Sequence, residues 1–369
     1  MDVTLNRTAL FDELQMIQGV IERRTTIPIL SNILLRAEGD RLHLAATDLD
    51  VTVFTHAPAA IRAEGSATIQ GRVFFDLVRS LPTDTVEITC AENRIEVRSG
   101  TFRSQLASLD PADFPTLPEV PEGQGFAIDV PVLHHLIDRS SFAVSSEEGH
   151  LQYNAALLAI TAANLEMVGT DGHRLAYVQM AHDAGQPPFE QQLLPRKVLT
   201  QLRRLPTSDD SVLYIARGEN HLAFRLGDRI LLSRILEARF PQYDRVLVRD
   251  NPHRVTVARK DLVAALRRVS LLASERTHGV QLQLDADSLS LSSVGFDLGQ
   301  AAEEVPCQYS GEALKVFLNA QYVMDFLGAV EAEAVEFQLR DSDSPVVLVP
   351  GSEDGANGEC LYVIMPIRL

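Results

Sequence analysis

The sequence predicts an α+β fold made of three copies of one unit, each about 120 residues long and rich in antiparallel strands. Equivalent features recur at a nearly constant spacing along the 369 residues. The apolar stripes of three helical segments begin at Phe74, Val198 and Tyr322, each 124 residues from the next. A Phe-Pro pair that closes a unit recurs after 126 residues, at Phe114 and Phe240. Agreement of separate features on one spacing indicates a repeat.

A hairpin in the middle unit is the most distinctive part of this repeat. Residues 165–180 hold two apolar runs joined at Asp171-Gly172, and an Asp-Gly step between strand-like runs is typical of a hairpin turn. Weaker copies of this pattern lie at residues 42–53 and 289–298. The aspartates of the three copies are 123 and 126 residues apart, at Asp48, Asp171 and Asp297.

The first unit is expected to hold two helices. Apolar residues at i, i+4, i+7 and i+11 from Leu10 place a helix at residues 7–24, and a second at residues 71–81 is stopped by Pro82. The proline-rich residues 110–125 indicate a linker. Strands are expected at residues 33–37, 42–46, 50–55, 65–69, 86–90, 94–99 and 105–109.

The second and third units repeat this order. Their helices are expected at residues 131–141, 195–205, 258–268 and 319–329. Their strands are expected at residues 156–160, 165–180 (the hairpin), 212–216, 221–226, 230–235, 280–284, 288–292, 335–339 and 346–349, followed by an apolar tail at 361–369. Each unit then has two helices and roughly eight strands. The predicted domains are residues 1–122, 126–246 and 247–369.

The composition excludes several classes of protein. The three cysteines, Cys90, Cys307 and Cys360, lack the spacing of a disulfide framework or a zinc site, and they suit a reducing cytoplasm. The first residues are charged and show no signal-peptide pattern. No apolar run approaches the roughly 20 residues of a membrane span. We therefore expect a cytoplasmic protein with no membrane partner, no metal and no cofactor.

The charge is distributed unevenly between helices and the rest of the chain. A net charge of −17 argues at first against binding nucleic acid. Yet residues 195–205 carry four basic side chains and no acidic one, and they fall opposite the apolar stripe. Residues 258–268 carry four basic residues and one acidic residue. Exposed helix faces often carry charge, but this asymmetry predicts a basic surface on an otherwise acidic protein.

The chemistry at the middle hairpin has two interpretations. Asp171, His173 and Arg174 lie together at its tip and could form an active site. However, no second acid, nucleophile, metal-ligand cluster or glycine-rich phosphate loop has a recognisable spacing. Without such a catalytic constellation, we predict that the chain is not an enzyme and that the hairpin tip is not an active site.

Several motifs are similar to those of one family. The chain resembles the bacterial DNA sliding clamp, the beta subunit of DNA polymerase III. The resemblance covers the whole chain in the family's order. It rests on Thr26-Ile-Pro-Ile-Leu-Ser-Asn, Ala46-Thr-Asp-Leu-Asp, Phe74-Phe-Asp-Leu, Asp113-Phe-Pro, Gly169-Thr-Asp-Gly-His-Arg-Leu-Ala, Phe240-Pro-Gln-Tyr and Tyr362-Val-Ile-Met-Pro-Ile-Arg-Leu.

The resemblance implies a homodimeric ring of two chains that encircles double-stranded DNA without sequence preference. The helices would line the hole, and the sheets would face outward. The clamp would be a non-catalytic processivity subunit of a polymerase holoenzyme that also includes a 3′–5′ exonuclease, associated with the nucleoid during replication. The basic residues that could line the hole are Arg24, Arg72, Arg196, Lys197, Arg203, Arg204, Arg259, Lys260, Arg267 and Arg268.

The resemblance also implies a hydrophobic cleft that binds short peptides containing Gln and apolar anchors. These would come from the replicative polymerase catalytic subunit, the clamp loader, translesion polymerases and repair proteins. Its expected lining is Tyr153, Thr170, Gly172, His173, Arg174, Leu175, Pro241, Arg245, Val246, Val346, Val363, Met365, Pro366, Ile367, Arg368 and Leu369. The expected dimer interface contains Arg103, Leu106, Leu271, Leu272, Glu303 and Glu304.

Two departures from the family pattern bear on these sites. Tyr153-Asn154-Ala155 stands where the family usually has Leu-Asn-Gly, which predicts a cleft of different shape. Leu151 and Gln152 stand where some members have aromatic residues that touch DNA. The alternative function is a clamp-like scaffold that binds partner peptides without encircling DNA.

Overall fold

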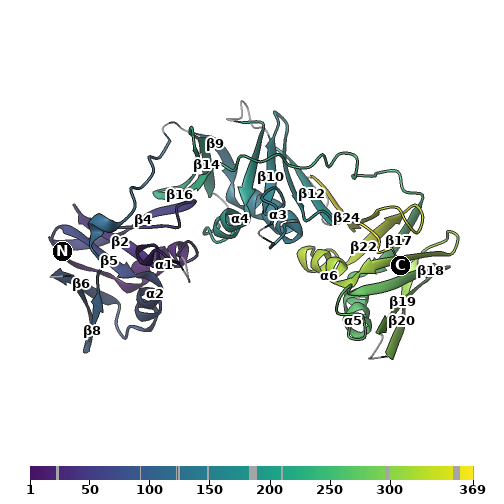
Figure 1. The fold of residues 1–369 in the computed structure, drawn as a ribbon, viewed down its shortest axis with the longest axis horizontal. Helices are drawn as coiled ribbons and strands as arrows, with labels where there is room; N and C mark the ends of the chain where they lie inside the picture. Colours follow the sequence, from purple (N-terminus) through teal and green to yellow (C-terminus); the bar gives the residue numbers. More distant parts are fainter. Residues whose placement is uncertain are drawn as a thin grey trace. The chain divides into compact units, whose positions relative to one another are not determined.

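The computed structural model describes the chain except residues 22–24, 92, 122, 124, 148, 183–188, 209–210, 296–298, 352–357 and 369. The helices of the described residues occur in pairs, two in each repeat (Figure 1). They are α1 (Arg7–Ile17), α2 (Gly71–Ser80), α3 (Val130–Ser140), α4 (Arg196–Leu202), α5 (Arg259–Ser270) and α6 (Ala320–Ala329). Among the described residues, no helix has both the length and the apolar character needed to cross a membrane.

Eight strands accompany each pair of helices in the described part of the chain. The first repeat has β1 (Asp2–Asn6), β2 (Asn32–Glu38), β3 (Arg41–Thr47), β4 (Val51–Ala63), β5 (Gly65–Gln70), β6 (Thr85–Ala91), β7 (Arg94–Ser99) and β8 (Phe102–Ala107). The second has β9 (Phe126–Asp129), β10 (Ala155–Ile160), β11 (Asn164–Thr170), β12 (Arg174–Ala181), β13 (Gln191–Pro195), β14 (Val212–Arg217), β15 (His221–Leu226) and β16 (Arg229–Arg234).

The third repeat has β17 (His253–Ala258), β18 (Gly279–Asp285), β19 (Ser288–Gly295), β20 (Gly299–Gln308), β21 (Leu314–Asn319), β22 (Ala334–Leu339), β23 (Val346–Pro350) and β24 (Gly358–Ile364). Strand β1 pairs antiparallel with β4 and β6, and the other ladders are antiparallel too. The prediction of three α+β repeats with two helices and antiparallel sheets each is therefore confirmed.

The strands assemble into two sheets of twelve, and the second repeat contributes to both. Its β16 pairs with β4 of the first repeat, whereas its β12 pairs with β24 of the third (Figure 1). The chain accordingly divides into two compact units, Met1–Leu133 with Lys197–Ile235 and His134–Arg196 with Leu236–Leu369. Within each unit, backbone hydrogen bonds join one repeat to the next, which makes each junction part of a sheet rather than a hinge.

Strands lead directly into helices, and the first helical turn is capped from the preceding strand. Asn6 Oδ1 accepts hydrogen bonds from the backbone N–H of Thr8 and Ala9 at 2.9 and 3.1 Å. Asn319 caps α6 in the same way, through the N–H groups of Gln321 and Tyr322. Such caps satisfy N–H groups that have no partner inside the helix.

Helix α1 ends earlier than the sequence predicts. Its expected end was residue 24, but the helix stops at Ile17, and Gln18 forms its C-terminal cap. The N–H of Val20 then turns back to the carbonyl of Ile17 at 3.0 Å. Gly19 lies in this turn, and glycine is costly inside a helix because it loses the most backbone freedom.

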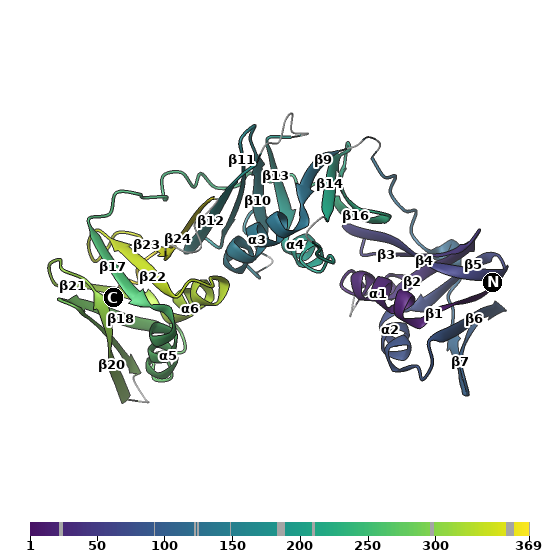
Figure 2. The ribbon, with the colours of Figure 1, turned by 180° about the vertical axis from the view of Figure 1, so that it is seen from behind.

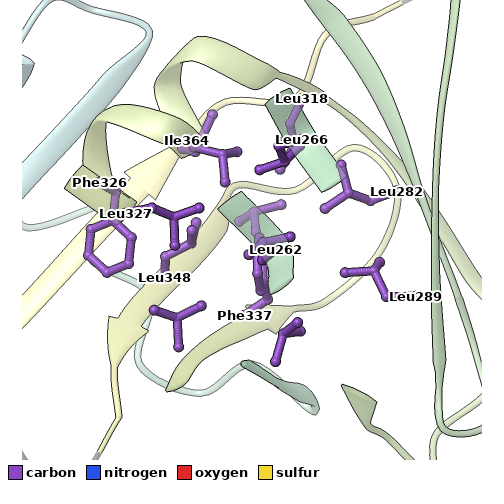
Figure 3. Close-up of a cluster of buried hydrophobic side chains, with 14 of the residues drawn as sticks. Leu262, Leu266, Leu282, Leu289, Leu318, Phe326, Leu327, Phe337, Leu348 and Ile364 are labelled. Carbon is purple, nitrogen blue, oxygen red and sulfur yellow. The ribbon is translucent and has the colours of Figure 1, made fainter. Parts of the chain in front are cut away.

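The core of the third repeat shows how the helices meet the sheet. Leu262 and Leu266 from α5 are fully buried against Phe326 and Leu327 from α6 (Figure 3). Helices α5 and α6 lie side by side in both views of the ribbon (Figures 1 and 2). Close packing of branched and aromatic side chains stabilises this arrangement by excluding water from apolar surface.

Candidate functional site

The tip of the β11–β12 hairpin is closed by its own side chains. Asp171 Oδ1 accepts hydrogen bonds from the N–H groups of His173 and Arg174 at 2.9 and 3.1 Å. Thr170 Oγ1 donates to the carbonyl of Arg174 at 2.6 Å and accepts from the N–H of Gly172 at 3.1 Å. Gly172 has φ +90°, which glycine adopts without steric cost. The turn is therefore fixed, and His173 is exposed on it.

The β3–β4 hairpin of the first repeat is closed by the same bonds. Asp48 Oδ1 accepts from the N–H groups of Asp50 and Val51, and Thr47 Oγ1 accepts from the N–H of Leu49. Leu49 takes the place of Gly172, although its φ is +81°. Asp48 and Asp171 thus have the same structural role, which is to accept the backbone hydrogen bonds that close the turn. Asp297, the third of the set, lies outside the described residues.

A pocket of about 200 Å³ opens beside the β11–β12 tip. Four segments line it: the turn before β10, the hairpin, the chain that follows the second repeat, and the end of β24 with the residue after it. Leu175 and Val363 are buried and contribute apolar walls, whereas Met365 is exposed at the side. The full lining is Tyr153, Thr170, Gly172, His173, Arg174, Leu175, Pro241, Gln242, Tyr243, Val246, Val363 and Met365.

Most residues of the predicted cleft lie in this pocket, but several do not. Val346 is buried in β23, and Arg245 is exposed nearby without lining the pocket. The backbone of the tail leaves the pocket after Met365, because the N–H of Ile367 donates to the carbonyl of Phe317 at 2.8 Å. Pro366 and Arg368 are likewise outside the lining, and Leu369 lies outside the described residues.

Gln242 and Tyr243 line the pocket although neither was among the residues predicted for the cleft. Both follow Pro241 in the Phe-Pro-Gln-Tyr motif, so adjacency to that motif was the available signal. Burial and the nearby carboxylate of Glu166 raise the pKa of Tyr243 to about 12. Its phenol therefore remains a neutral wall of the pocket at physiological pH.

Arg174 forms part of the pocket wall, but its charge is satisfied within the protein. Its guanidinium binds Asp171 at 2.9 Å, Asp325 of α6 at 2.5 Å and the carbonyl of Phe142 at 2.9 Å. It also lies 4.3 Å from the centre of the Tyr322 ring. Only 11% of the side chain is exposed. Arg174 therefore fixes the hairpin to α6 and offers a ligand mainly its aliphatic stem.

The basic residues predicted to meet DNA differ in their exposure to solvent. Arg72, Arg196, Arg203, Arg204, Lys260, Arg267 and Arg268 are exposed, whereas Lys197 and Arg259 are half-buried. The Lys197 ammonium binds the carboxylate of Asp48 and the carbonyl of Val20. The Nε of Arg259 donates to the carbonyl of Leu327 at 2.7 Å. Arg24 lies outside the described residues.

Four of the residues predicted for a dimer interface lie on two incompletely paired strands, and the other two follow helix α5. Within the described part of the chain, strand β8, which carries Arg103 and Leu106, pairs only with β7 and ends its sheet. Strand β20, which carries Glu303 and Glu304, pairs along its length with β19, but β17 reaches only its last residues. Leu271 is 75% exposed at the end of α5, and Leu272 follows it half-buried.

Glu303 already has a partner in its own chain. Arg268 binds it through two hydrogen bonds of 2.8 and 2.5 Å. Arg103 of a second copy was predicted to face this acidic pair. The bond from Arg268 lowers the pKa of Glu303, so the carboxylate stays ionised. A second copy would meet an ion pair at this position rather than a lone carboxylate.

Comparison with protein families gives three consecutive matches. The N-terminal, central and C-terminal domain models of the DNA polymerase III beta subunit match residues 1–118, 127–242 and 244–368. The Beta sliding clamp of Pseudomonas aeruginosa is 35% identical over 371 residues, and that of Escherichia coli is 33% identical over 373. In both comparisons the alignment covers 100% of each chain.

Solved structures agree with the family matches. The DNA polymerase III subunit beta of Pseudomonas aeruginosa superposes with a TM-score of 0.91 at 35% identity. A sliding clamp from Bartonella birtlesii, solved bound to griselimycin, has a TM-score of 0.93 at 32% identity. Both comparisons cover 100% of each chain.

Proposed function

Because the chain belongs to the family of the bacterial DNA polymerase III beta subunit, the beta sliding clamp, we propose that two copies close into a ring around duplex DNA. The family is that of a processivity factor without catalytic activity, so the chain is a replication protein and not an enzyme. The ring would hold the replicative polymerase on its template. It would act on DNA in the cytoplasm, on the nucleoid during replication.

The two incompletely paired strands support ring closure. An exposed strand edge presents unpaired N–H and C=O groups that can pair with another chain. Strand β8 of one copy can add to β20 of a second, and the same contact would then form twice. Burial of Leu106 and Leu271 would contribute a few kcal/mol at roughly 25 cal/mol per Å². A contact between two different edges either closes into a ring or continues as a filament, and closure removes both edges.

The exposed basic side chains support passage of DNA without tight binding. Arg72, Arg196 and Lys260 lie on helices and can meet phosphates through solvent. Phosphate contacts carry no sequence information and weaken with salt. A closed ring needs only such weak contacts because topology retains it. Lys197 and Arg259 would contribute less than their charge suggests, since each already has a protein partner.

The pocket beside the β11–β12 tip supports peptide binding, and it is the observation that carries this part of the proposal. Apolar walls from Leu175, Val246 and Val363 give buried area, and the flexible Met365 can adapt to different anchors. A short peptide with Gln and apolar anchors fits such a site. We place the replicative polymerase catalytic subunit, the clamp loader, translesion polymerases and repair proteins among its sources.

Two experiments test this function. A fluorescent peptide containing Gln and apolar anchors should bind the wild-type protein, and Met365→Asp, at an exposed position of the pocket, should weaken binding at least tenfold without changing the oligomeric state. Loading onto nicked circular DNA by a clamp loader should give a complex that survives high salt and is lost when the DNA is linearised. Peptide binding without such retention would support the scaffold alternative, which family membership does not favour.

A further inference from the structure

A second cavity, of about 320 Å³, lies in the first repeat on the β2–β3–β4 sheet. Leu34, Ala45 and Phe54 form one row across the three strands, and Leu117 of the following linker lies at the cavity wall. The neighbouring row begins with Arg36 and His43, which also line the cavity. The site is therefore an apolar space bordered on one side by polar side chains.

The second repeat shows what occupies the equivalent place there. Val168 and Tyr177 pair across β11 and β12, and they lie 123 residues after Ala45 and Phe54. Tyr243, from the segment after the second repeat, lies over this row with its ring 6.2 Å from that of Tyr177. Its hydroxyl donates to the carboxylate of Glu166 at 3.3 Å. An aromatic side chain of the same chain thus covers the sheet.

The first repeat lacks this aromatic side chain. The Phe-Pro spacing of 126 residues makes Leu117 the counterpart of Tyr243. Leucine is shorter than tyrosine and has no hydroxyl group, so it leaves space above Ala45 and Phe54 that Tyr243 fills in the second repeat. Removal of a large side chain from a packed site leaves a cavity that remains favourable to refill.

His43 takes the place of Glu166 at the polar end of the cavity. Burial lowers the pKa of His43, and the nearby His56 and the cationic Arg41 and Arg36 lower it further against the opposing effect of Glu38. The imidazole is therefore neutral at pH 7, and a neutral imidazole has one nitrogen that can accept a hydrogen bond. His56 is already engaged with Arg41 and Asp228.

We propose that this cavity binds a tyrosine side chain of a partner protein, in the position that Tyr243 has in the second repeat. The ring would lie against Phe54 and Leu117, and the hydroxyl would donate to His43. Arg36 and Glu38 both border the cavity, and Arg36 is exposed and forms no ion pair among the described residues, so an acidic residue on the Arg36 side of the tyrosine would complement it. This surface is separate from the cleft that contains Met365.

The cavity can be tested with N-acetyl-L-tyrosinamide and methyl-labelled full-length protein. The probe should shift the methyl signals of Leu34 and Leu117 with a Kd of about 1 mM, as expected for a fragment of this size. N-acetyl-L-phenylalaninamide should bind roughly fivefold more weakly because it lacks the hydroxyl group. Equal binding of the two probes would overturn the contact with His43.

Substitution of Leu117, which lies at the cavity wall, gives an independent test of the proposal. Leu117→Tyr makes the first linker resemble the second, so it should fill the cavity, raise the melting temperature and abolish the shift at Leu34. The matched Leu117→Ala variant should lower the melting temperature but keep the response of Leu34 to the probe. Absence of any shift at Leu34 in the wild-type protein, or unchanged probe binding by Leu117→Tyr, would overturn the proposal.

Discussion

Replacement of Arg174 by alanine is predicted to be among the most damaging single changes in the second repeat. The substitution leaves Asp171 and Asp325 without their cationic partner and removes a hydrogen bond to the carbonyl of Phe142. Breaking a buried ion pair from one side costs about 3–5 kcal/mol. For a folding unit of this size, that corresponds to a fall of about 10 °C in melting temperature.

Arg249→Ala is the matched control for this prediction. Arg249 also binds a carboxylate, that of Glu359, through two hydrogen bonds, but 52% of its side chain is exposed compared with 11% for Arg174. Solvent screens an exposed pair, so its loss should leave the melting temperature almost unchanged. Differential scanning calorimetry of both variants at pH 7 measures the contrast. Equal melting temperatures for the two variants would refute the argument that Arg174 fixes the hairpin to α6.

Three further substitutions test separate parts of the account. Leu49→Gly should raise the free energy of unfolding by about 0.5–1 kcal/mol, because Leu49 has φ +81° and is 53% exposed. Thermal unfolding measures this change, and a loss of stability would contradict the prediction. Tyr153→Leu should change the ratio of affinities between different cleft peptides by threefold or more, because the ring borders the pocket at Gly172. Unchanged affinity ratios in fluorescence titrations would show that Tyr153 does not set specificity. Leu271→Asp should shift the protein toward monomer in sedimentation velocity, because it puts a charge into the proposed interface, and an unchanged distribution would place the interface elsewhere.

The sequence predicted the helices well because their apolar stripes are long and end at clear signals. The predicted helix at residues 71–81 is α2, Gly71–Ser80, and that at 319–329 is α6, Ala320–Ala329. The first helix was placed too long because Ile21 continues the stripe beyond Gly19. Local propensity at the glycine overrides a periodic pattern there.

Six strands were missed, and their sequences explain why. Strand β9 has four residues, and β13, Gln191–Pro195, begins with two glutamines and ends at a proline. Strand β20 carries Glu303, Glu304 and Pro306, which disfavour a strand in isolation. These segments become strands through pairing with distant partners, which no local pattern reports. The others were β1, β17 and β21.

The cleft was predictable in outline from motif positions, but the roles of its residues were not. Arg174 was selected for the cleft from the family motif and Lys197 for its charge, yet each is bound to a carboxylate of its own chain. Asp48 and Asp325, which provide these carboxylates, lie more than 140 residues away in the sequence. A sequence shows which groups are present, whereas the tertiary fold determines which of them are already satisfied.

The mass of the native protein in solution tests the central claim most directly, since encirclement of DNA requires a closed ring of two chains. Light scattering near physiological salt at micromolar concentration should give twice the chain mass of 40.6 kDa. The measured mass should stay constant on moderate dilution, because a closed ring has two identical contacts and both must open before the two chains separate. A mass of one chain at micromolar concentration would contradict the ring and the topological retention on DNA that depends on it.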